Sequence, residues 1–341
     1  MQSPKPFGGI SIIAVGDLFQ LKPVMDSYIF TQPGSGYLPL ASNLWTDLFT
    51  MVELTEILRQ ADNKEFAELL NRLREGNHTS ADIAALKEQL ILSESGNYPS
   101  NAPHLFATNE RVNSFNNTII LQADKPKFTI TAKDIVVGST PQSMKDKILN
   151  NFRASSQTKQ FHNVLEVCEG IWHDLTVNLD TSDGLINGAS CIIRRIDIPF
   201  GKTVPCGKLW VQFHEKYIGV ALLNSKRSLF RRGIDKQWTP IEPIVKQYPA
   251  GHKGQVNVQR LQFPLRPAHA KTIHRSQGDT MATAVVDLTT KRKVDHLHYV
   301  ALSRLTSKDG LHILNLQEDK ISADKRNMYA ANVPGYNTMC I

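Results

Sequence analysis

The chain has 341 residues, of which 41% are hydrophobic and 21% are charged. These values are typical of a globular protein of two or three domains and exclude a disordered or low-complexity chain. The 4 cysteines include no CxxC pair, so we expect no disulfide framework and no metal site built from the chain's own side chains. No apolar run approaches the ~18 residues of a membrane span, so we expect no membrane partner.

The net charge of +7 is divided unevenly along the chain. Residues 1–189 contain 15 Lys and Arg against 21 Asp and Glu, a net charge of −6, whereas residues 190–341 contain 24 against 11, a net charge of +13. A basic part of this size favours a polyanion as partner. Nucleic acid is favoured over a membrane because no basic amphipathic helix is visible, and an ordinary solvated surface is the alternative.

The first predicted element is a short apolar run near the start of the chain. Ser11–Val15 has the continuous apolar pattern of a buried parallel strand. Asp17 and Gln20 follow it, at the edge where ligands bind in open parallel sheets. The Gln20 amide can donate and accept, so it can sense a phosphate oxygen or an attacking water. A purely structural loop is the alternative.

Helices are predicted where apolar residues recur at helical spacing: Ser42–Thr50, Lys64–Glu75 and about Ser80–Leu90. Ser42 is expected to cap the first of them. Asp62 and Glu65 resemble a capping pair for the second. We expect the apolar stripes of these helices to pack into a core.

A further strand and helix are expected around residues 104–119. His104–Ala107 has a strand pattern, and Thr108 and Asn109 lie where this strand turns into a helix. These two residues either cap the helix or donate hydrogen bonds to a nucleic-acid backbone. Residues 122–165 show no clear pattern, and we expect loops and short elements there.

Short β-rich runs alternate with Gly and Pro over residues 191–263: IIRRI, KLWVQF, YIGVALL and VNVQRLQF. They predict a small, basic antiparallel barrel or sandwich inserted in the chain. It is either a structural insertion or a clamp on single-stranded nucleic acid. The clamp would use the cations and aromatic residues of this segment: Arg194, Arg195, Lys226, Arg227, Phe230, Arg231, Arg232 and Trp238. After it, strands alternate with helices, which implies a parallel sheet.

The segment with the most concentrated functional pattern is AKTIHRSQGDT at Ala270–Thr280, followed by HYVALSR at His298–Arg304. Between them, Thr283–Leu288 has the pattern of a buried strand. A His, an Arg, a Gln and a Gly crowd into one short stretch before this strand. Such a composition is typical of a surface that binds phosphates and responds to a nucleotide.

Six segments in chain order carry a family resemblance: GDLFQLKPV, LTEILRQ, HLFATN, DGLINGA, AKTIHRSQG and HYVALSR. The set resembles the Pif-like (petite integration frequency) helicases, in the RecD-like branch of superfamily 1. The resemblance implies an α/β fold, with a RecA-like parallel-sheet helicase core and an inserted small β-barrel of the Src-homology type. It implies a remnant of the first RecA-like domain at 1–52, a second RecA-like domain at 53–185 and 264–341, and the barrel at 186–263.

The resemblance also implies a role for each matching position. Arg59 and Arg304 match two arginines that reach the transferred γ-phosphate, where guanidinium groups stabilise the spread charge. Gln20 is grouped with them as catalytic. Three residues would couple the nucleotide to DNA: Asp17, Gln277 and Gly278. Five match DNA contacts: Thr108, Asn109, Thr272, His274 and Ser276.

The family activity is ATP-dependent 5′-to-3′ translocation on single-stranded DNA with unwinding of duplex or forked DNA. It implies ATP and Mg²⁺ as cofactors and a role in DNA repair, recombination and telomere maintenance. The expected location is the nucleus, with the mitochondrion as the alternative. The oligomeric state is not indicated.

Two parts of the family pattern are missing from the sequence. It contains no GxxxxGK(S/T) phosphate loop, and no Asp-Glu pair for Mg²⁺ precedes GDLFQ. We therefore expect the chain to start within the first RecA-like domain, its ATP and Mg²⁺ sites to be incomplete, and the chain alone to lack ATPase activity. The alternative is a catalytically dead remnant that binds single-stranded DNA, or a transposon-borne helicase tail.

Overall fold

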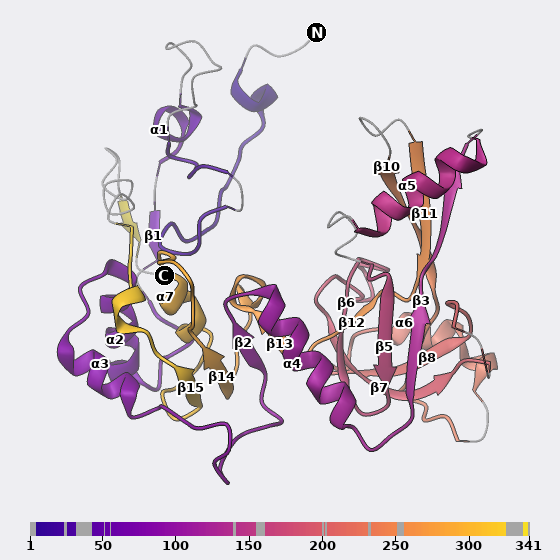
Figure 1. The fold of residues 1–341 in the computed structure, drawn as a ribbon. Coiled ribbons are helices and arrows are strands. Elements are labelled where there is room, and N and C mark those ends of the chain that lie inside the picture. Colours follow the sequence, from indigo (N-terminus) through magenta and orange to yellow (C-terminus); the bar gives the residue numbers. More distant parts are fainter. Residues whose placement is uncertain are drawn as a thin grey trace. The chain divides into compact units, whose positions relative to one another are not determined.

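The computed structural model describes residues 5–23, 26–31, 43–50, 52–54, 56–138, 141–154, 161–199, 201, 203–230, 233–250, 256–324 and 337–339. The chain forms two compact units, which are described separately here (Figure 1). Unit 1 comprises residues 1–109 and 271–341, and unit 2 comprises residues 110–270. Within the described residues, no helix is both long and apolar enough to span a membrane.

Unit 1 is built on a four-stranded sheet in the order β13-β2-β14-β15. Its strands are β2 (His104–Phe106), β13 (Ala270–Thr272), which starts at the unit boundary, β14 (Ala284–Asp287) and β15 (Leu311–Asn315). The central strand β14 pairs in parallel with both β2 and β15, and it is buried along its whole length. The predicted α/β class with a parallel sheet is therefore confirmed, as is the buried strand expected within Thr283–Leu288.

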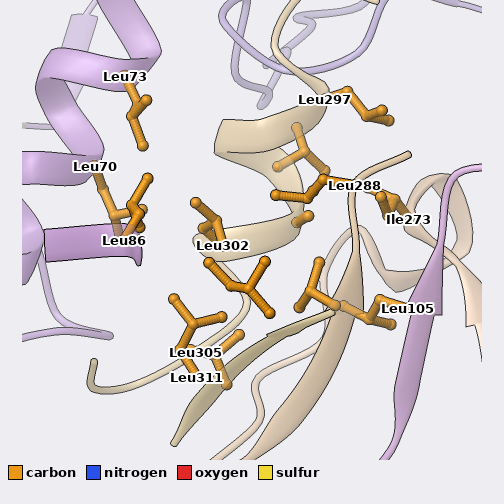
Figure 2. Packing of buried hydrophobic residues seen from close by; sticks show 14 of the residues in the cluster. Leu70, Leu73, Leu86, Leu105, Ile273, Leu288, Leu297, Leu302, Leu305 and Leu311 are labelled. Atoms are coloured by element: carbon orange, nitrogen blue, oxygen red, sulfur yellow. The ribbon is translucent and has the colours of Figure 1, made fainter. Parts of the chain in front are cut away.

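The helices of unit 1 are η1 (Pro6–Gly9), α1 (Leu44–Leu48), α2 (Lys64–Glu75), α3 (Ser80–Lys87), η5 (Ile273–Ser276), α7 (Leu297–Leu302) and η6 (Glu318–Lys320). Figure 2 shows how leucines of α2, α3 and α7 meet residues of the sheet in one apolar cluster. Two further strands, β1 (Val52–Leu54) and β16 (Asn337–Met339), pair in parallel with each other.

Helix α2 has the bounds that the sequence predicts, but its cap differs. The side chain of Asn63 accepts a hydrogen bond from the Phe66 amide at 3.1 Å. The predicted capping pair of Asp62 and Glu65 is wrong, because the residue directly before the first helical residue is the one placed to accept this bond. The helix ends at Gly76, whose φ of 74° is readily adopted only by glycine.

The other two predicted helices are shorter than expected. Helix α1 is capped by Asn43, whose side chain accepts from the Trp45 amide, and the predicted cap Ser42 lies outside the described residues. Helix α3 is capped by Thr79, which forms a reciprocal capping box with Asp82.

The strand predicted at Ser11–Val15 is wrong. This segment is irregular, and Ile13 and Val15 are 90% and 89% exposed. A buried strand needs neighbouring strands to take up its backbone hydrogen bonds, and none of the described strands lies beside this segment. The loop that follows it, from Asp17 onward, is nevertheless fixed in place, as described below.

Unit 2 is centred on a five-stranded antiparallel sheet in the order β12-β6-β7-β8-β9. Its strands are β6 (Trp172–Leu175), β7 (Ser190–Asp197), β8 (Lys208–Phe213), β9 (Thr239–Ile241) and β12 (Leu265–Pro267). Among the described strands, no pairing joins the outer strands β12 and β9, so closure into a barrel stays a prediction. Strands β6 and β12 lie outside the 186–263 segment, so this sheet is wider than the predicted insertion.

The rest of unit 2 is a second, smaller sheet with helices. Strands β4 (Lys133–Val137), β10 (Ile244–Ala250) and β11 (Val256–Gln262) form one antiparallel sheet, and β3 (Lys127–Thr131) pairs with β5 (Val164–Cys168). The helices are α4 (Asn109–Gln122), which starts at the unit boundary, α5 (Gln142–Ala154), α6 (Val220–Ser225) and η3 (Arg227–Leu229). The 13-residue helix α5 contradicts the expectation of only loops and short elements over 122–165.

The strand predicted at YIGVALL is also wrong, since this segment contains helix α6. The carboxylate of Asp183 accepts hydrogen bonds from the amides of Ala221 and Leu222, at 2.8 and 2.9 Å. It thereby satisfies two of the free amides at the helix start, and this contact from a residue far away in sequence outweighs the local strand preference.

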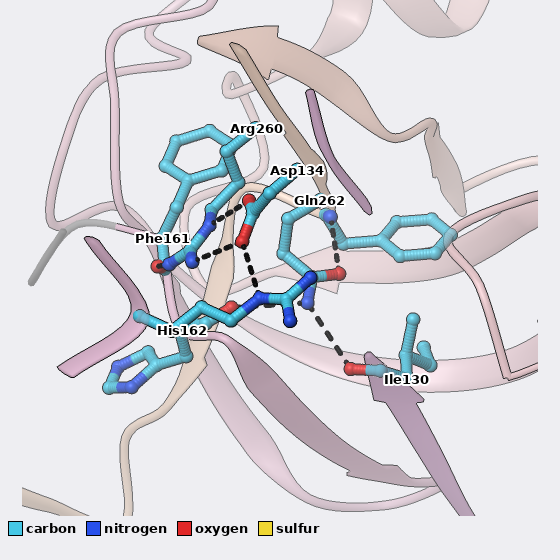
Figure 3. A network of polar contacts seen from close by, with 8 residues as sticks. Ile130, Asp134, Phe161, His162, Arg260 and Gln262 are labelled. Carbon is cyan, nitrogen blue, oxygen red and sulfur yellow. Dashed lines mark hydrogen bonds and ion pairs between the residues drawn. The ribbon is translucent and has the colours of Figure 1, made fainter. Parts of the chain in front are cut away.

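A buried ion pair joins two strands of the smaller sheet (Figure 3). Arg260 on β11 donates two hydrogen bonds to the carboxylate of Asp134 on β4, at 2.7 and 2.8 Å, and a third to the Phe161 carbonyl at 2.9 Å. Both side chains are fully buried. Arg153 on α5 also donates to the Asp134 carboxylate, at 3.4 Å. The buried pair, with this additional contact, fixes how these strands and the preceding loop pack.

Candidate nucleotide-coupling site

Asp17 is held between two helices of unit 1. Its carboxylate accepts a hydrogen bond from the guanidinium of Arg74 on α2 at 3.2 Å, and one from the Tyr299 hydroxyl on α7 at 3.5 Å. It also accepts from the Phe19 amide at 2.9 Å, which closes a turn over residues 17–20. The Arg74 guanidinium lies 4.4 Å from the centre of the Phe19 ring, so the same arginine holds the turn twice. Asp17 thus fixes the loop onto α2 and α7.

Gln20 at the end of this turn contacts the segment after β13. The Gln277 side chain donates to the Gln20 side-chain oxygen at 3.1 Å, although the two residues are 257 positions apart. The Gln20 amide nitrogen in turn donates to Asp17 at 3.3 Å. Three of the residues expected to act together are therefore brought together: Asp17, Gln20 and Gln277.

Arg59 lies at a junction of three segments. Its guanidinium donates to the Thr280 hydroxyl at 3.0 Å and to the Ser303 carbonyl at 3.1 Å. The neighbouring Gln60 is 5% exposed and donates to the carbonyls of Ser303 and Leu305, at 3.4 and 2.6 Å. The segment LTEILRQ is thereby attached to the end of helix α7.

Arg304 directly follows this helix end and is only 2% exposed. Its guanidinium donates to the Val300 carbonyl at 2.9 Å and to the Ser303 hydroxyl at 2.8 Å. Burial lowers the pKa of Arg304, and the nearby positive charge of Arg59 lowers it further, whereas Tyr299, Asp279 and Asp17 act in the opposite direction. The two arginines expected at the γ-phosphate therefore lie within range of each other's charge.

Neither of these two guanidinium groups forms an ion pair with a described carboxylate. Two neighbouring positive charges repel each other, and a bound anion would relieve this repulsion. Guanidinium groups suit phosphate oxygens because their donors form a planar fork. The arrangement is thus chemically fit to bind a phosphate group.

The residues of AKTIHRSQG form a tight turn around η5. The Thr272 hydroxyl caps it by accepting from the Arg275 amide at 3.3 Å, and the Ser276 hydroxyl donates to the Ile273 carbonyl at 2.9 Å. Both hydroxyl groups belong to buried residues, whereas the His274 side chain is exposed. Gly278 has a φ of +91°, which favours glycine, and it turns the chain toward Thr280. Of these predicted DNA contacts, His274 alone is presented to solvent.

The chain is similar to known proteins over most of its length. Residues 1–83 match the family model described as "PIF1-like helicase". The ATP-dependent DNA helicase PIF1 of Candida albicans is 26% identical over 94% of this chain, and the PIF1 of Emericella nidulans is 28% identical over 93%. The crystal structure of Pif1 helicase from Candida albicans matches 97% of this chain and 70% of that chain, with a TM-score of 0.71 and 25% identity.

The chain is similar to Pif1-like helicases over more than nine-tenths of its length. It spans 41% and 44% of the two curated relatives, so it corresponds to less than half of each. The structure of Pif1 helicase from Bacteroides in complex with ADP-AlF3 and ssDNA is 20% identical, with a TM-score of 0.66 over 97% of this chain, and supports the fold.

Not every position that matches the Pif1-like pattern lies in this site. Thr108 directly precedes helix α4 and Asn109 begins it, where the first segment of unit 1 ends. Of the cations and aromatic residues predicted to form the clamp in unit 2, Arg231 and Arg232 lie outside the described residues. The described parts of the chain also contain no cluster of three or more His, Cys, Asp or Glu side chains that could hold a metal ion.

Four contributing residues were missed from the sequence: Gln60, Arg74, Tyr299 and Ser303. Gln60 and Tyr299 lie within the motifs LTEILRQ and HYVALSR, so their place in these motifs could have identified them as site residues. Arg74 had no comparable signal, because a basic residue in the last turn of a helix ordinarily serves the helix end itself. Ser303 also lies within HYVALSR and accepts from Arg304 through its hydroxyl, but its carbonyl contact to Arg59 is a backbone contact that the residue type does not indicate.

Proposed function

We propose that this chain is part of an ATP-dependent DNA helicase of the Pif1 type. It contributes a DNA-binding surface and two arginines that bind the γ-phosphate. The observation that carries the proposal is the pair Arg59 and Arg304, which both donate to Ser303 and form no ion pair with a described carboxylate. During phosphoryl transfer, charge spreads over the equatorial oxygens of the γ-phosphate, and such guanidinium groups stabilise it. Arg59 is half-buried and reaches a phosphate first. Arg304 must turn away from Val300 to join it.

The same proposal gives the turn at Asp17–Gln20 a coupling role. Its contact to Gln277 joins it to the turn that contains His274, and its contacts to α2 and α7 join it to the helix that ends at Arg304. A change in nucleotide state that moves Arg304 would therefore move Gln20 and the turn at η5 together. Such a mechanical link is what ATP-driven translocation requires.

The partner that we propose is DNA, single-stranded and forked, with 5′-to-3′ movement. The net charge of +13 over residues 190–341 supports a polyanion partner. His274 and the basic residues of unit 2 would contact the backbone, and Thr272 and Ser276 would hold the turn that presents His274. Roles in repair, recombination and telomere maintenance, and a location in the nucleus or mitochondrion, rest on the family resemblance.

For this chain by itself we propose no ATP hydrolysis, because its sequence contains no GxxxxGK(S/T) loop to cradle phosphates. ATP and Mg²⁺ would then need groups supplied from outside this sequence. A second candidate function is a remnant, or a mobile-element copy, that only binds single-stranded DNA. The basic second half of the sequence favours this candidate equally.

The arginine assignment is tested in a product of the same gene that also carries a GxxxxGK(S/T) loop. Arg59→Ala and Arg304→Ala are each expected to lower kcat for DNA-stimulated ATP hydrolysis by about 10³-fold or more, by analogy with arginine fingers. Arg72→Ala is the control, because this arginine pairs with Asp82 away from the site, at 2.7 Å. Wild-type kcat in both site variants, with DNA binding unchanged, would exclude the assignment.

A further inference from the structure

Three consecutive cations stand out in the loop between β14 and α7. Lys291, Arg292 and Lys293 are all exposed, and none of them forms an ion pair or hydrogen bond with a described residue. They belong to none of the motifs that define the candidate site. Asp295 is the single acidic residue between Thr289 and His296. The loop therefore carries an uncompensated positive charge.

Three other lysines of unit 1 are neutralised by neighbours. Lys87 pairs with Glu318 at 2.5 Å, Lys308 with Glu88 at 3.3 Å, and Lys320 with Asp319 at 3.5 Å. These pairs link helix and loop surfaces of the unit and leave little net charge there. The contrast distinguishes the 291–293 loop from an ordinary solvated surface.

The loop that carries the three cations is anchored at both ends. On the strand side, the Thr289 amide donates to the Asp287 carboxylate at 2.9 Å, and the Thr290 amide donates to the Gln317 side chain at 2.9 Å. On the helix side, the His296 amide donates to the Ser322 carbonyl at 2.8 Å. The three side chains are thus carried on a fixed support, which lowers the entropy lost when they bind a ligand.

The position of the loop in the sheet is that of a ligand site. It follows the carboxyl end of β14, the central strand, whose neighbours β2 and β15 run parallel to it. In open parallel sheets, ligands bind outside the carboxyl ends of the strands. The three cations therefore belong to a loop at the edge of the sheet where ligands bind in such folds.

We propose that Lys291, Arg292 and Lys293 form an additional contact for the phosphodiester backbone of single-stranded DNA. This proposal rests on the proposed function, because it names a further contact for the same partner. The three Cα atoms span about 7 Å of chain and their side chains are exposed, which suits a row of phosphates better than one phosphate in a closed cradle. Contacts of this kind hold the strand without reading its sequence.

The test measures binding of the full chain to a fluorescent oligo-dT by anisotropy over a series of salt concentrations. The variant K291A/R292A/K293A is expected to bind about fivefold or more weakly at low salt. The slope of log K against log salt should fall by up to about 2, at about 0.7 for each lost phosphate contact. The charge-preserving variant K291R/R292K/K293R should bind as the wild type does.

The matched control is K87A/K308A/K320A, which also removes three cations of unit 1, all of them ion-paired in the structure. It should leave the slope unchanged. An unchanged slope in the 291–293 variant, or an equal loss in the control, would overturn the proposal while the proposed function stands. If the wild type itself does not bind at low salt, both the DNA-binding function and this inference fail. Thermal melting of each variant shows that it is folded.

Discussion

At the scale of single residues, the chemistry of unit 1 follows from which polar groups are left without a partner of opposite charge. The Asp17 carboxylate accepts from four donors and serves as a fixed point. Arg304 has hydrogen-bond acceptors but no ion pair, and the charge of Arg59 lies close by. The first arrangement stabilises the structure, whereas the second leaves positive charge available to an anion.

His298 on α7 is the residue from which we expect the clearest pH effect. It is 2% exposed, and neither ring nitrogen has a hydrogen-bond partner among the described residues. Burial lowers its pKa to about 4, and the nearby His78 also lowers it. The unfolded chain therefore binds a proton more readily, and stability is lost as the pH falls from about 6.5 towards about 4.

We predict that unit 1 of the wild type is less stable at pH 5 than at pH 7.5, and that H298L removes much of this difference. Each unit of pKa difference corresponds to about 1.4 kcal/mol. Urea unfolding at the two pH values measures the effect, and H214L, at an exposed histidine of unit 2, controls for the loss of an imidazole. An unchanged pH dependence in H298L would contradict the prediction.

At the scale of elements, the sequence predicts what local pattern determines and misses what distant residues determine. Helix α2 has the predicted bounds because its apolar residues recur at helical spacing and Gly76 stops it. The local pattern predicts a strand where helix α6 forms, because Asp183, which accepts from the Ala221 amide at the helix start, lies 38 positions away. Ser11–Val15 has a strand pattern, but a pattern cannot supply the neighbouring strands that a buried strand needs.

The candidate site divides in the same way. The motif residues Gln20, Gln277, Arg59 and Arg304 could be named from the sequence, since each stands in a recognisable segment. The contact between Arg74 and Asp17 could not be predicted from the sequence, because it depends on how α2 packs against the loop at residues 17–20. The burial of Thr272 and Ser276 could not be predicted from the sequence either. Both match DNA contacts by sequence, yet their hydroxyl groups form hydrogen bonds within the turn.

The ion pair of Arg260 with Asp134 lets the packing of the smaller sheet be tested. We predict that D134L alone destabilises the chain by about 3–5 kcal/mol, because it leaves the fully buried Arg260 without its counter-charge. The double variant D134L/R260M should regain most of this loss, because it leaves no buried unpaired charge, and Arg153, which also pairs with Asp134, is partly exposed to water. Urea unfolding of the wild type, both single variants and the double variant gives the coupling energy. A double variant as unstable as the sum of the single variants would contradict the prediction.

At the scale of the whole molecule, the two compact units have different proposed roles. Unit 1 holds the parallel sheet, the two arginines and the turn that links Gln20 to Gln277. Unit 2 holds the antiparallel sheets and much of the basic charge. The resemblance to Pif1-like helicases extends over more than nine-tenths of the chain, whereas the chain spans 41% and 44% of the first two relatives. DNA binding is therefore the proposed activity that can be tested directly with this chain.

The most direct test of the account is to titrate the full chain with single-stranded DNA at several salt concentrations and to follow ATP hydrolysis in the same samples. The account predicts binding that weakens steeply with salt, because phosphate contacts release counterions, and no DNA-stimulated hydrolysis. Absence of binding even at low salt would contradict the assignment to a DNA-dependent enzyme. DNA-stimulated hydrolysis that is lost in R304A would contradict the proposal that this chain is inactive alone, while it would support the role of Arg304.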